Sequence, residues 1–75
     1  MKWIKIIELH RIYYEGEYVC CSEPLERKFL IQTISDEFPH LSRVRIAALV
    51  DQCQKVHKVP ILRTVFVHFF QGYLD

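Results

Sequence analysis

Hydrophobic residues recur every three or four positions along most of the chain, which is the spacing of one face of an α-helix. Four stretches carry this pattern, approximately residues 2–15, 23–38, 42–57 and 60–74. The sequence therefore predicts a mostly α fold: a small bundle of about four helices that forms a single compact helical domain over residues 1–75.

The first stretch also allows a second structure. Trp3 and His10 share one helical face, and Gly16 then lies just past the helix end, in a position that favours a positive φ. Tyr, Ile and Val also favour strands, however, so residues 10–14 and 17–21 have the composition of a β-hairpin around Gly16. An α+β fold with this N-terminal β-hairpin is the alternative to the bundle.

Capping residues and prolines mark the expected ends of the later helices. Ser22 offers a capping hydroxyl before the second helix, Pro39 ends that helix, and Ser42 caps the third. Pro60 has the geometry of a first-turn residue, so the last helix is expected to begin there. These signals divide the chain into helices joined by short connections.

Composition excludes several classes of protein. Apolar residues make up 51% of the 75 residues and charged residues 25%, which is typical of a globular chain. With two glycines and no asparagine, the sequence has no phosphate-binding glycine loop and no N-glycosylation acceptor. The longest unbroken apolar run, Ile46–Val50, is too short to span a membrane, and the N-terminus has no signal-peptide pattern. We therefore expect a cytoplasmic protein with no membrane partner.

Metal binding and catalysis draw little support from residue spacing. Cys53 and His57 lie four residues apart on one helical face, so both could ligate zinc, with Cys20 and Cys21 completing the set. Zinc ligands are usually separated by about two to four residues, which makes the adjacent cysteines a poor match. No histidine or cysteine has the spacing of a known catalytic motif. We expect no enzyme, no cofactor and no metal, with these four residues as weak metal candidates.

Aromatic residues indicate a role in protein association. Ten aromatic residues in a chain of 75 carry more apolar area than a small core easily hides. The last helix repeats large apolar residues over most of its length, so its apolar face is wider than one neighbouring helix covers. The sequence predicts a small interaction domain that binds itself, or another protein, through Phe66, Phe69, Phe70 and Tyr73.

The second half of the chain suggests a different function. After Phe38 the chain has five Lys or Arg residues and only two Asp or Glu residues. Its helix over residues 42–57 follows a short turn, which is the outline of a helix-turn-helix motif. As a reading helix it would direct Arg43, Arg45, Gln52 and Lys55 towards DNA. Acidic residues on the preceding helix oppose phosphate binding, so a DNA-binding regulator is the less favoured alternative.

Overall fold

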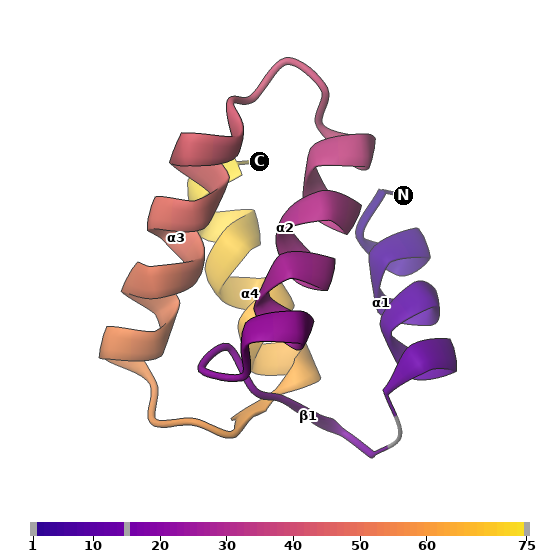
Figure 1. Ribbon diagram of the computed structural model, residues 1–75, viewed down its shortest axis with the longest axis vertical. Coiled ribbons are helices and arrows are strands. Elements are labelled where there is room, and N and C mark those ends of the chain that lie inside the picture. Colours follow the sequence, from indigo (N-terminus) through magenta and orange to yellow (C-terminus); the bar gives the residue numbers. More distant parts are fainter. Residues whose placement is uncertain (1, 15, 75) are drawn as a thin grey trace.

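The part of the chain that the structure describes forms four helices and two short strands (Figure 1). The computed structural model describes residues 2–14 and 16–74, and the side chains of residues 3–14 and 16–73. The elements are α1 (Lys2–Tyr13), β1 (Tyr18–Val19), α2 (Pro24–Glu37), α3 (Arg43–Val56), β2 (Ile61–Leu62) and α4 (Arg63–Leu74). The prediction of a mostly α fold with four helices is confirmed.

The first stretch of the chain is helical. It forms α1, which ends at Tyr13, so residues 10–14 and 17–21 do not pair as a hairpin. The chain turns at Gly16, whose φ of 91° lies in the left-handed region that glycine adopts without a steric penalty. The positive φ predicted for Gly16 is therefore confirmed.

The strand β1 pairs with β2, which lies far along the chain, in a two-stranded antiparallel sheet. Beside this pair, the backbone N–H of Arg63 donates to the carbonyl oxygen of Glu17 at 2.7 Å. Because β2 uses the residues directly after Pro60, the last helix begins at Arg63, and the prediction that it begins at Pro60 is wrong. The register places Tyr18 opposite Leu62 and Val19 opposite Ile61.

Side-chain caps fix the starts of α2 and α3. The hydroxyl of Ser42 accepts a backbone N–H of the first turn of α3 at 3.1 Å, as predicted. The cap of α2 is Glu23, whose carboxylate accepts the N–H of Glu26 at 2.7 Å. The prediction that Ser22 caps this helix is wrong, because the helix begins at Pro24 and the cap is the residue directly before it.

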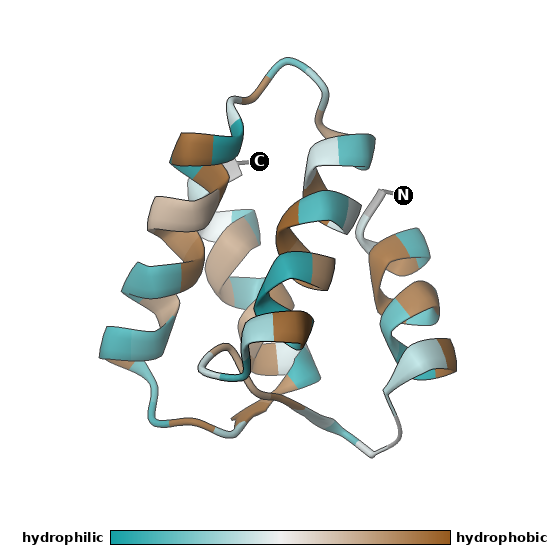
Figure 2. Cartoon of the chain, viewed as in Figure 1, coloured by the Kyte–Doolittle hydropathy of each residue, from teal (hydrophilic) through white to brown (hydrophobic). Residues whose placement is uncertain are grey.

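The helices form a ring in which α1 contacts α2, α2 contacts α3, α3 contacts α4, and α4 contacts α1. In Figure 1, α2 and α3 run side by side in opposite directions, and α4 lies behind them. Each helix carries both hydrophobic and hydrophilic residues (Figure 2), as expected of helices with one buried face. None of the helices described is both long enough and apolar enough to cross a membrane.

Aromatic rings from three parts of the chain meet in the core. The ring of Trp3 lies 5.2 Å from that of Phe38 and 5.7 Å from that of Phe70, and Phe70 lies 4.8 Å from Phe66. These contacts join the first, second and last helical segments. The buried apolar residues are Trp3, Ile6, Val19, Cys21, Leu30, Ile31, Ile34, Phe38, Ile46, Leu49, Val50, Cys53, Ile61, Phe66, Val67 and Phe70.

Candidate functional site

The four residues predicted to bind a partner lie on two sides of α4. Phe66 and Phe70 are buried in the core, so the folded chain leaves no surface on them for a partner, and that part of the prediction needs correction. Phe69 is partly buried, and Tyr73 is 54% exposed, with their ring centroids 5.0 Å apart. Positions 69 and 73 are one helical turn apart, and they mark the outer face of α4.

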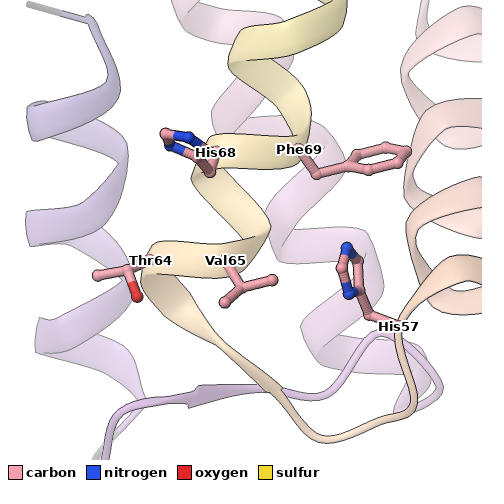
Figure 3. A pocket seen from close by; sticks show the side chains of 5 residues that line it. All are labelled: His57, Thr64, Val65, His68 and Phe69. Carbon is pink, nitrogen blue, oxygen red and sulfur yellow. The ribbon is translucent and has the colours of Figure 1, made fainter.

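This outer face borders a hollow of about 400 Å³ (Figure 3). In the view of Figure 3, Val65 lies in the middle, with His57 and Phe69 on one side and Thr64 and His68 on the other. The rings of His57 and Phe69 lie 6.2 Å apart and are nearly perpendicular, at 87°. His57 reaches this position because it is the C-cap of α3. The two histidines do not converge on a common point.

A second hollow, of about 410 Å³, adjoins the first and shares His57 and Val65 with it. Its other lining residues are Tyr18, Val56, Lys58, Pro60, Ile61 and Leu62. We give the name α4 surface to five apolar side chains that line these hollows, together with Tyr73, whose ring lies next to that of Phe69. Among the described residues, Lys58 carries the only fixed charge that lines either hollow. The α4 surface consists of Tyr18, Val56, Leu62, Val65, Phe69 and Tyr73.

The residues predicted to contact DNA are all exposed on α3. Asp51 is also exposed on this helix, and it accepts two hydrogen bonds from the guanidinium of Arg27, at 3.1 and 3.2 Å. These bonds raise the pKa of Arg27. In Figure 1, α2 and α3 lie side by side in opposite directions, whereas helix-turn-helix motifs cross at about 90–120°. The exposed residues are Arg43, Arg45, Gln52 and Lys55.

Two of the three candidate metal-binding thiols are buried, and the third is partly exposed. Cys21 and Cys53 are fully buried, and burial raises the pKa of Cys21 to about 12 and that of Cys53 to about 11. A metal binds the thiolate, so a ligand role for either thiol would require the loss of a proton that burial makes harder to remove. The thiol of Cys20 lies 3.3 Å from the hydroxyl of Ser22. Among the described residues, no three His, Cys, Asp or Glu side chains form a metal-binding group.

A buried polar network is the feature that the sequence did not predict. His10, Glu26 and Arg63 are only 1%, 7% and 9% exposed, and they come from α1, α2 and α4. The His10 Nε2 atom lies 2.9 Å from Glu26 Oε2, and the Arg63 Nε atom donates to His10 Nδ1 at 3.0 Å. The one signal available in the sequence was the position of His10 on the apolar face of the first helix.

The hydrogen bonds define the protonation state of the imidazole. Because Arg63 donates to Nδ1, this nitrogen carries no proton, and Nε2–H donates to Glu26. The Glu26 carboxylate also accepts the backbone N–H of Cys20 at 2.9 Å. Arg63 Nη2 donates to the carbonyl oxygens of Tyr14 and Gly16, at 3.4 and 2.6 Å. His10 is therefore neutral and links two opposite charges.

A hollow of about 710 Å³ lies over this network. Arg11, Glu17 and Arg63 line it, together with Ile7, Gly16, Leu62 and Thr64. The Arg63 guanidinium is held by His10 and by two backbone carbonyl groups, and Glu17 brings a negative charge to the opening. The network therefore connects three helices and does not present a free catalytic group to this hollow.

No family model, no curated protein and no solved structure matches this chain.

Proposed function

We propose that this chain is a small helical interaction domain that associates with a second copy of itself through the α4 surface. The observation that supports this function is the pair of adjoining hollows along α4, which bring five apolar side chains of the α4 surface together, with the ring of Tyr73 next to that of Phe69. A continuous exposed apolar area of this kind is typical of a protein interface.

Charge favours a second copy as the occupant. A two-fold contact brings the same surface of each protomer together, so an interface with many like charges opposes itself. The α4 surface is bordered by one fixed charge, Lys58, which places little repulsion across such a contact. The exposed side of α1 differs, because it carries Lys5, Glu8 and Arg11. The α4 surface is therefore suited to self-association.

The area that a stable dimer must bury indicates that both hollows along α4 belong to the interface. Stable complexes bury about 800 Å² on each partner, which is roughly a sixth of the 4878 Å² accessible surface of this chain. Tyr18 and Leu62, on the sheet, extend the contact beyond the outer face of α4. We therefore place both the sheet and α4 in the interface.

Replacing Val56 and Tyr73 together by Lys tests self-association. Both side chains are exposed near helix C-termini, where a cation interacts favourably with the helix dipole, so the fold should be retained. The native protein is expected to be a dimer in native mass spectra and light scattering between about 1 μM and 1 mM. The double variant is expected to be a monomer, because two cations from each copy would enter the interface.

The matched control is Ile12→Lys with Tyr13→Lys. These residues are an aliphatic and a tyrosine, like the test pair, and both are exposed in the last turn of α1. This control is expected to remain a dimer. A native protein that is monomeric throughout the concentration range, or a control that dissociates as fully as the test variant, would contradict the proposal.

The exposure of the four predicted α3 residues keeps DNA binding as a second candidate function. The antiparallel course of α2 and α3 and the exposed carboxylate of Asp51 make it the weaker one. Electrophoretic mobility shifts with duplex DNA test it directly, because Arg43→Ala with Arg45→Ala should abolish binding if α3 enters the groove.

A further inference from the structure

A hollow of about 420 Å³ lies between α2 and α3 and shares no lining residue with the α4 surface. We call it the α2–α3 groove. It combines apolar side chains with three cations, a combination that neither hollow along α4 shows. The residues that line it are Arg27, Lys28, Ile31, Arg43, Val44 and Ala47.

The apolar part of the α2–α3 groove contains an unusually exposed side chain. Val44 is 81% exposed, the highest value among the large hydrophobic residues described. Ile31 is buried and Ala47 is partly buried beside it. A small alanine leaves room above the helix backbone, so an apolar side chain from another molecule could contact Val44 there.

The charges around the α2–α3 groove are unequal. Arg27 is paired with Asp51, but neither Lys28 nor Arg43 makes an ion pair among the residues described. Lys28 and Arg43 are both exposed. The groove therefore presents two uncompensated positive charges next to an apolar floor.

We infer that the α2–α3 groove binds an acidic amphipathic helix of a partner protein. Such a helix would place an apolar residue against Val44 and carboxylates beside Lys28 and Arg43. The lining residues lie at positions 27–31 of α2 and 43–47 of α3, about one turn of each helix, so the groove has room for the side chains of about one to two turns of a partner helix. This binding does not depend on self-association, because the α4 surface lies elsewhere.

A protein helix fits this groove better than DNA does. The DNA backbone would bring phosphates to the cations, but it has no apolar group to cover Val44 and Ile31. Asp51, at the edge of the same helix face, also repels phosphate. An acidic partner helix can have an uncharged residue at the position that faces Asp51. A nucleic-acid backbone cannot, because it has a negative charge at every nucleotide.

Fluorescence anisotropy with a labelled peptide tests this inference. The probe is an amphipathic helix of about 15 residues, with Leu on one face and Glu on the other. Arg43→Glu is expected to weaken its binding to the full chain about tenfold, because a groove cation becomes an anion. Arg45→Glu is the matched control, since it makes the same change in the first turn of α3 but does not line the groove. The affinity of the Arg45→Glu variant for the peptide should differ from that of the native chain by less than about twofold.

Peptide variants separate the contributions of charge and apolar contact. A peptide with Lys in place of Glu should not bind, and one with Ala in place of Leu should bind several-fold more weakly. The inference is overturned if the acidic peptide shows no saturable binding, or if Arg43→Glu and Arg45→Glu weaken it equally. The inference is also overturned if the chain binds duplex DNA more tightly than the peptide and if Arg43→Glu and Arg45→Glu weaken DNA binding equally. That result would identify α3 as a nucleic-acid surface.

Discussion

The neutral imidazole of His10 connects the buried carboxylate of Glu26 to the buried guanidinium of Arg63. Each ring nitrogen has one partner, so neither charge lies in the core without a hydrogen bond. The sequence could place His10 inward, because it follows the spacing of its apolar neighbours. It could not pair Arg63 with His10 across 53 positions, because that contact exists only after the helices assemble.

Replacing Arg63 by Met should leave the Glu26 carboxylate buried without its opposite charge. We expect the free energy of unfolding to fall by about 3–5 kcal/mol, measured by urea denaturation. The control is Arg11→Met, because Arg11 pairs with Glu8 at an exposed site, where the expected loss is below about 1 kcal/mol. Adding Glu26→Gln to Arg63→Met should recover part of the loss. Equal losses in the two single variants would show that the network does not stabilise the fold.

The helices were the most predictable elements. Their apolar spacing extends over several turns, and Ser42 marks the start of α3 through a side chain that can bond only nearby N–H groups. The strands were not predictable, because two residues are too few to show alternation. Spacing also did not separate the core residues of α4 from its surface residues. Phe66 and Phe69 belong to one apolar pattern, yet only Phe66 is fully buried.

The two faces of α4 should respond differently to truncation. Phe66→Ala removes a ring from a filled core and should cost about 3–5 kcal/mol, enough to unfold much of a small domain. Phe69→Ala should cost roughly half as much in the free energy of unfolding, because part of its ring already contacts solvent. Thermal unfolding followed by circular dichroism distinguishes the two. A Phe69→Ala protein that is less stable than Phe66→Ala would show that the outer face is part of the core.

At the scale of the whole molecule, the ring of helices presents separate surfaces on different helix pairs. The α4 surface is formed by the sheet, by α4 and by the C-terminal end of α3. The α2–α3 groove is formed by α2 and by the N-terminal part of α3. The local sequence could not show which apolar residues of α3 lie at the surface. Val44 and Ile46 are both apolar, but the folded chain buries Ile46 and leaves Val44 exposed.

The buried thiols should make the stability of the whole molecule sensitive to alkali. Their pKa values are raised from the ordinary 9 to about 12 for Cys21 and about 11 for Cys53. Below pH 9 both states hold these protons. Between about pH 9 and 11, the unfolded chain loses them while the folded chain keeps them, so stability falls by up to roughly 1.4 kcal/mol per pH unit for each thiol.

Urea denaturation at a series of pH values measures this effect. The double variant Cys21→Ala with Cys53→Ala should show a shallower loss of stability above pH 9 than the native chain. Cys20→Ser is the control, because Cys20 is outside the buried pair and its replacement should leave the slope unchanged. If all three proteins lose stability with the same slope, groups other than the buried thiols cause the alkaline transition.

The pairing of β1 with β2 also bears on how the protein folds during its synthesis. A ribosome makes the chain from its N-terminus, so β1 is synthesised well before β2. During that interval Val19 has no strand to pair with, and Glu26 has no guanidinium to balance its charge. The ring of helices therefore closes only after β2 and α4 have been synthesised.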